Sequence, residues 1–119
     1  MKIKFALLSV LGLSLVLTSC KKGDPITYDC TGLTPTYTSD VKVLMDNKCA
    51  TSGCHSANSK ADGKDFSSYS AVKNDASKSS FMGSMQHLSG YKAMPQGGTK
   101  LSDTELQTIS CWISNGTPQ

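Results

Sequence analysis

The sequence predicts a small all-α domain, and three observations point to this fold class. Apolar residues recur at helical spacing in several segments, some of them preceded by helix-capping residues. No segment alternates apolar and polar residues in the manner of a β-strand. Residues 20–119 contain only 13 Leu, Ile, Val and Phe residues. So thin a core needs crosslinks, a metal or a large apolar cofactor to be stable.

The first 19 residues have the features of a signal peptide. A basic head, Met1 to Lys4, precedes a largely apolar run over residues 5–17. A membrane-spanning helix needs about 20 apolar residues, so this run is too short to be one. We therefore predict that residues 1–19 are a signal peptide and that the rest of the chain is exported.

Residues 17–20, Leu-Thr-Ser-Cys, resemble the lipobox of bacterial lipoproteins. The resemblance implies cleavage before Cys20 and a lipid on its thiol, which would anchor the protein to a bacterial membrane at its periplasmic or outer surface. An ordinary signal peptide with an incidental Cys is the alternative. Residues 20–37, which contain two Gly and two Pro, are predicted to form a lipidated tether and irregular arm, and residues 38–119 to form the domain.

The domain is expected to begin with two short helices separated by a loop. Ser39 and Asp40 can cap a first helix that runs to about Lys48. Residues 50–67 are rich in Ser, Gly, Asn and Lys, which predicts a loop. A weak helix is expected over residues 68–75.

Two further helices are expected in the second half of the domain. Four apolar residues recur at helical spacing within residues 79–88, namely Phe81, Met82, Met85 and Leu88. The last helix opens with a capping box, Ser102 to Glu105, and with a hydrophobic staple made by Leu101 and Leu106. An Asn-Gly pair at residues 115–116 ends it.

The charge pattern argues against nucleic acid as a partner. The chain has no Arg, and the 10 Lys after Cys20 are scattered and nearly balanced by 9 acidic residues. Nucleic-acid binding needs basic residues gathered on one surface. No constellation of catalytic residues is recognisable either. We therefore expect neither an enzyme nor a small-molecule substrate.

The chemistry of the chain is concentrated in Cys49-Ala-Thr-Ser-Gly-Cys54-His55. Two cysteines with a His directly after the second suit covalent haem attachment, in which both thiols bond the porphyrin and the imidazole binds the iron. The usual spacer has two residues and this one has four, with Gly53 available to fold the wider loop back. The alternatives are a Cys49–Cys54 disulfide and a zinc site that adds His87.

Residues 36–117 resemble the small cytochrome c-like domains of bacterial exported proteins. The resemblance rests on the C-x4-C-H motif, on Met94-Pro95 in the segment AMPQGG, 39 residues after His55, and on the closing segment LSDTELQTISCWISNG. It implies three to four short helices wrapped around one covalent haem c, with the N- and C-terminal helices packed together.

The same resemblance assigns the haem-binding residues. Cys49 and Cys54 would hold the haem covalently, His55 would be its proximal axial ligand, and Met94, in a loop over residues 90–100, would be the distal one.

Three rivals for the distal position are weaker. Met82 and Met85 belong to an apolar helix stripe, where Met is more often a packing residue than a ligand. His87 falls on the opposite side of that helix, where we expect a solvated side chain. An open sixth position ranks after His87.

The remaining two cysteines are expected to form a disulfide. Once lipid has taken Cys20 and haem has taken two cysteines, Cys30 and Cys111 are left, and outside the cytoplasm free thiols rarely persist. On the last helix Cys111 lies about 100° from the edge of the apolar stripe, where the arm around Cys30 can lie across it.

The sequence therefore predicts a membrane-anchored monohaem c-type cytochrome that transfers single electrons outside the cytoplasm, with other redox proteins as partners. The transfer would be outer-sphere, because no substrate bonds to the iron. The alternative from another class is a haem-free lipoprotein, stapled by two disulfides, that acts as an interaction module. Weak peroxidase activity at an open iron is the third reading.

Overall fold

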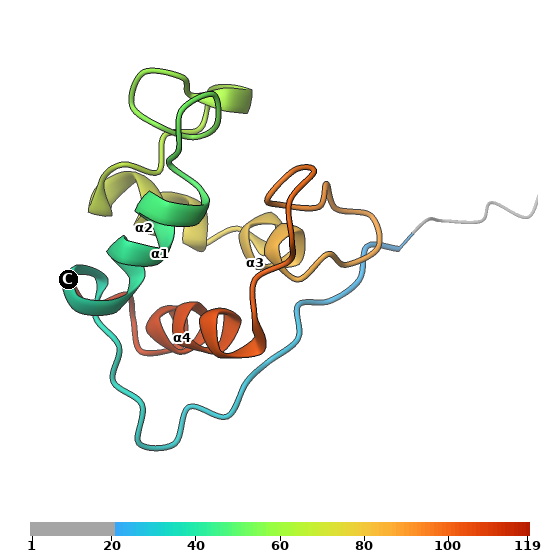
Figure 1. The fold of residues 1–119 in the computed structure, drawn as a ribbon. Coiled ribbons are helices and arrows are strands. Elements are labelled where there is room, and N and C mark those ends of the chain that lie inside the picture. The colour runs from blue at the N-terminus through green and yellow to red at the C-terminus, as the bar shows by residue number, and fades with distance from the viewer. Residues whose placement is uncertain (1–20) are drawn as a thin grey trace, which may run out of the picture.

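The computed structural model of the chain describes residues 21–119, which fold as four α-helices without a β-strand (Figure 1). The helices are α1 (Lys42–Lys48), α2 (Tyr69–Ala76), α3 (Ser79–Met85) and α4 (Asp103–Ser114). A π-helical turn, η1 (Tyr37–Val41), leads directly into α1, and a 3-10 turn, η2 (Ala61–Gly63), lies in the long loop that follows α1. The predicted all-α class is confirmed for this part of the chain.

The predicted signal peptide, residues 1–19, and the predicted lipid attachment site, Cys20, lie outside the described residues. Within residues 21–119 no helix is long and apolar enough to cross a membrane.

The first helix begins earlier than the sequence predicts. Its N-cap is Thr36 and not Ser39, because the Thr36 hydroxyl accepts a hydrogen bond from the Ser39 N–H at 3.3 Å. The Thr36 N–H in turn donates to the Asp40 carboxylate at 2.8 Å. These are the reciprocal bonds of a capping box, with the acid four residues after the cap because the π-helical turn is wider than an α-helical one. The predicted end at Lys48 is correct.

The last helix has the predicted start, and it forms one wall of the core. Both bonds of the Ser102–Glu105 capping box are present, and Leu101 and Leu106 are buried. Trp112 is fully buried against Tyr37, with ring centroids 6.0 Å apart, and its indole N–H donates to the Pro118 carbonyl at 2.7 Å. Thus α4 packs on η1, the π-helical turn that leads into α1, so the two ends of the domain meet.

The third helix is shorter than predicted, ending at Met85 and not at residue 88. His87 has a φ of +57°, in the left-handed region, and the N–H of Leu88 donates to the Gly83 carbonyl at 3.0 Å. The His87 N–H donates to the Ser84 carbonyl at 3.2 Å. Together these bonds form a Schellman motif, a helix end at which Gly is the usual left-handed residue. Because a His occupies this position, the sequence does not indicate where the third helix ends.

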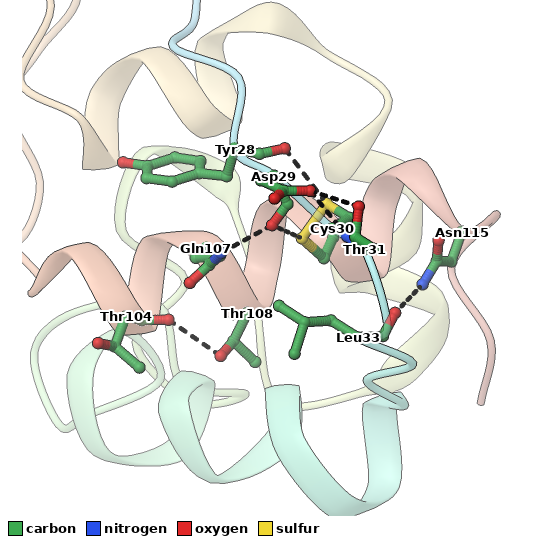
Figure 2. Close-up of a disulfide and its surroundings, with 10 residues drawn as sticks. Tyr28, Asp29, Cys30, Thr31, Leu33, Thr104, Gln107, Thr108 and Asn115 are labelled. Carbon is green, nitrogen blue, oxygen red and sulfur yellow. Dashed lines mark hydrogen bonds between the residues drawn. A yellow bond between two sulfur atoms is a disulfide. The ribbon is translucent and has the colours of Figure 1, made fainter.

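The irregular arm before η1 crosses α4 and is bonded to it (Figures 1 and 2). A disulfide joins Cys30 to Cys111, as predicted. The Gln107 side chain donates to the Asp29 carbonyl at 2.7 Å, and the Asn115 side chain donates to the Leu33 carbonyl at 3.0 Å. Cys111 lies off the apolar stripe, but the arm covers it completely.

Replacing both cysteines of this disulfide, Cys30→Ala with Cys111→Ala, should lower the free energy of unfolding by about 3–5 kcal/mol. The bond closes a loop with a sequence separation of 81, and opening it returns that conformational freedom to the unfolded chain. Urea denaturation of variant and parent measures the difference. Leu33→Ala, at an exposed position on the same arm, is the control and should change stability little. Equal stabilities, or peptide mapping that finds Cys30 bonded to Cys49, would contradict the assignment.

Candidate functional site

A cavity of about 410 Å³ brings together all four residues that the sequence assigns to haem binding. Cys49, Cys54 and His55 line it from the loop after α1, and Met94 lines it from the loop before α4. Figure 1 shows these two loops on one side of the helical core, away from the stretch of arm that crosses α4. The volume falls within the range of small-molecule and cofactor sites, about 300–1,000 Å³.

The cysteine loop closes on itself at His55. Cys49 is the C-cap of α1, and its N–H donates to the Met45 carbonyl at 2.9 Å. The His55 N–H donates back to the Cys49 carbonyl at 3.0 Å. Gly53 has a φ of +79°, a conformation that suits only Gly at little cost. The four-residue spacer is therefore taken up by a closed turn that keeps Cys49 and His55 adjacent.

The His55 imidazole is buried and oriented by its surroundings. Its ring lies against Phe66, with centroids 4.7 Å apart, and its Nδ1 makes a long hydrogen bond, 3.4 Å, with the Lys64 carbonyl. The tautomer that donates this bond has its proton on Nδ1 and a lone pair on Nε2. A metal-binding His is commonly held in this way by a backbone carbonyl.

Lys64, whose carbonyl bonds His55, is itself held to α2 by an ion pair. The Lys64 ammonium lies 3.5 Å from the Asp75 carboxylate, which is largely buried and also pairs with Lys78. The segment behind His55 is also fixed by the Phe66 N–H, which donates to the His55 carbonyl at 2.8 Å. The imidazole is thus held between the cysteine loop and the second helix.

Met94 is half-buried, and two hydrogen bonds of its backbone hold it beside α3. Its N–H donates to the Ser84 carbonyl at 3.0 Å, and its own carbonyl lies 3.0 Å from Nε2 of His87. His87 is exposed and does not line the cavity. The contact between His87 and Met94 was not predicted, because it depends on the left-handed backbone at His87.

The other two Met candidates differ in their surroundings. Met82 is buried and lies away from the cavity, as expected for a packing residue, whereas Met85 is buried and borders the cavity. The helix stripe that contains both gives no sign of this difference. Met85 is therefore the nearer rival of Met94.

The walls of the cavity suit a flat apolar group. Phe66, Phe81 and Tyr91 contribute rings to it, and Pro95 contributes an apolar edge. Exposed residues such as Cys54 and Lys92 also line it, so the cavity reaches the surface. Two free thiols and one imidazole line this apolar space together with the thioethers of Met94 and Met85, and a covalently bound haem uses donors of these three kinds.

The two thiols differ in environment. Cys49 is half-buried and Cys54 is exposed, and neither is in a disulfide. Burial, with a smaller contribution from the neighbouring Cys54 thiol, raises the pKa of Cys49 to about 11. No three His, Cys, Asp or Glu side chains between residues 21 and 119 converge as a metal site, so the zinc hypothesis gains no support.

Comparisons with models of protein families, with curated proteins and with solved structures returned no match to this chain.

In protein whose Cys49 and Cys54 thiols are both free, alkylation at pH 8 should modify Cys54 much faster than Cys49. With a pKa near 11, about one thousandth of Cys49 is thiolate at that pH, and only the thiolate reacts. The rate at Cys49 should then rise about tenfold for each pH unit up to its pKa. Mass spectrometry of digests quantifies each site, and Cys54→Ser isolates the reaction of Cys49. Similar rates for both thiols at pH 8 would show that burial does not raise the pKa of Cys49.

Proposed function

We propose that this protein is a membrane-anchored monohaem c-type cytochrome that carries single electrons outside the cytoplasm. The observation that supports it best is the shared cavity. Residues 49–55 and Met94 are far apart in the sequence, and the fold brings them to one apolar space of cofactor size. The chemistry of these side chains matches covalent attachment and axial ligation of one haem c.

Four residues of the cavity have distinct parts in this proposal. Cys49 and Cys54 would form the thioether bonds, His55 would bind the iron through Nε2, and Met94 would offer its thioether sulfur from the other loop. Bound haem would supply the reversible Fe3+/Fe2+ couple. The aromatic walls would bury part of the surface of the bound group, and burial of this kind is one means by which a protein sets a potential.

The positions of the supporting residues favour a fixed ligand set. The Lys64 carbonyl orients the His55 ring, and the Ser84 carbonyl holds the Met94 backbone on α3. A fixed ligand set needs little rearrangement when the charge of the group changes, as an outer-sphere electron carrier requires. The proposal includes no enzymatic activity.

The runner-up is a haem-free lipoprotein that acts as an interaction module. One observation favours it: Val41, Leu106, Ile109 and Trp112 are fully buried with protein atoms alone. Against it stands the second disulfide that it needs, because Cys49 and Cys54 are both free thiols in the structure.

Protein matured with a cytochrome c assembly system should contain one haem that survives denaturing electrophoresis, because thioether bonds do not dissociate. Intact mass should rise by one haem, and the double variant Cys49→Ser with Cys54→Ser should lose the covalent group. The Cys30→Ala and Cys111→Ala pair is the matched control and should keep it. A mature protein whose mass shows two disulfides and no haem would exclude the cytochrome.

Met94→Ala should abolish the weak far-red absorption band of a thioether bound to ferric haem. It should also lower the reduction potential, because the sulfur ligand favours the ferrous state, and open the iron to small ligands. Visible spectra and a redox titration measure both effects. Met82→Leu, which nearly conserves volume away from the cavity, should leave the band intact and cost less than about 1.5 kcal/mol.

Two further variants identify the ligand if Met94 is not it. Loss of the band in Met85→Leu alone would move the assignment to Met85. A parent protein without the band, whose low-spin spectrum survives Met94→Ala and is lost in His87→Ala, would establish ligation by two His residues.

A further inference from the structure

We infer that the arm holds one edge of the cavity, formed by residues 89–92, against an anionic membrane surface. The inference rests on the lipid anchor of the proposed function. It concerns the orientation of the domain, which neither the motif nor the lipobox resemblance addresses.

The arm is bonded to the domain almost from its first described residue, so it is not a free tether. The side-chain amide of Gln86, which is 2% exposed, makes two hydrogen bonds with Ile26. Its oxygen accepts from the Ile26 N–H at 2.8 Å, and its nitrogen donates to the Ile26 carbonyl at 2.7 Å. A buried amide that satisfies both polar groups of one residue fixes the arm at that point.

Two residues nearer the N-terminus make further contacts with the same edge. The Gly23 N–H donates to the Ser89 carbonyl at 2.9 Å, and the Lys22 ammonium lies 5.1 Å from the centre of the Tyr91 ring, in cation–π geometry. A Cβ placed on Gly90 would lie 2.9 Å from the Lys22 side chain. The arm and the edge therefore approach more closely than a residue with a side chain at position 90 would allow.

The edge is in turn packed on α3. A Cβ on Gly83 would lie 2.7 Å from the Tyr91 ring, so this ring rests directly on the helix backbone. Gly83, Tyr91 and Lys22 thus form a stack from the third helix to the start of the arm. The position of Lys22 relative to the cavity is fixed through this stack.

Only Lys21 separates the proposed lipid attachment site, Cys20, from Lys22. Two residues of extended chain span at most about 7 Å, which limits how far a lipid on residue 20 could be from this edge. A lipidated Cys20 would place Lys22 and the edge that it contacts next to the headgroups. A flexible linker of ten residues would allow roughly 17 Å instead.

The charges at this edge suit an anionic bilayer. Lys21, Lys22 and Lys92 are all exposed, and Asp24 is the one acidic residue in residues 21–24 and 89–92. Lysines close to a membrane are attracted by anionic headgroups. The cavity is also lined by Lys22, Tyr91 and Lys92. A redox partner that reaches the cavity from this side would therefore have to lie at the membrane surface as well.

The test uses the mature, lipidated holoprotein added to the outside of preformed vesicles that contain anionic lipid. Single variants place a thiol at the edge, Lys92→Cys, or at the opposite end of the domain, Thr38→Cys, where η1 is bonded to the C-terminal segment. The rate of modification by a bulky water-soluble maleimide is compared with the rate in the same variant that also contains Cys20→Ser, which has no lipid. Binding to vesicles should slow the reaction severalfold at position 92 and leave it unchanged at position 38.

A second variant tests whether the pinned arm causes the orientation. Ten Gly and Ser residues inserted between Cys20 and Lys21 should preserve the haem spectrum and vesicle binding while restoring the rate at position 92. Equal protection of both positions, or protection at position 92 that survives the insertion, would overturn the inference. Haem is read from absorbance in the same samples, so a protein that has haem but lacks this protection contradicts the orientation alone, whereas a protein without haem contradicts the proposed function.

Discussion

The attachment of the arm to α4 is the constraint on which the rest of the structure depends. A helix with one apolar stripe usually leaves its other side to solvent. Here the stripe packs on η1, and the side that contains Cys111 is covered by the segment around Cys30 (Figure 2). Trp112 and Leu106, on the stripe, are completely buried, and Cys111 on the other side is completely buried as well. The arm substitutes for a further helix.

On the other side of the core, the two long loops contain little regular structure, although Phe66 and Leu101 belong to the buried cluster. Each is nevertheless anchored at its base, the first by the cap of α1 at Cys49 and the second by the bond from Met94 to Ser84. Loops anchored on a rigid scaffold are the usual place for binding residues. The cavity forms where these two anchored loops face each other across α3.

The sequence was most informative where local chemistry decides the structure. The capping box at Ser102 involves only four residues, so the sequence predicts the start of α4, whereas the first helix begins with a wider π-helical turn that makes Thr36 the cap. The end of α3 was missed because His87, not Gly, adopts the left-handed conformation. In the site, the C-x4-C-H motif identified adjacent residues. The support of His55 by Lys64 and of Met94 by His87 depends on tertiary contacts that no local pattern encodes.

The small number of aliphatic and Phe residues therefore has a different physical meaning from the one that a count over the whole domain suggests. Counting apolar residues over the whole domain predicts a core that needs crosslinks, a metal or a large apolar cofactor, and the half of the domain around α4 is closed by protein atoms and by one such crosslink. On the side of the cavity, Phe66, Phe81 and Met85 line the space but are themselves buried as part of the same hydrophobic cluster. In the proposed function, haem bound there would add contacts to these buried walls. The disulfide and the core around α4 thus lie on one side of this domain, and the proposed haem site lies on the other. The two sides are connected by α3 and by the arm, which is bonded to Gln86 at the end of that helix.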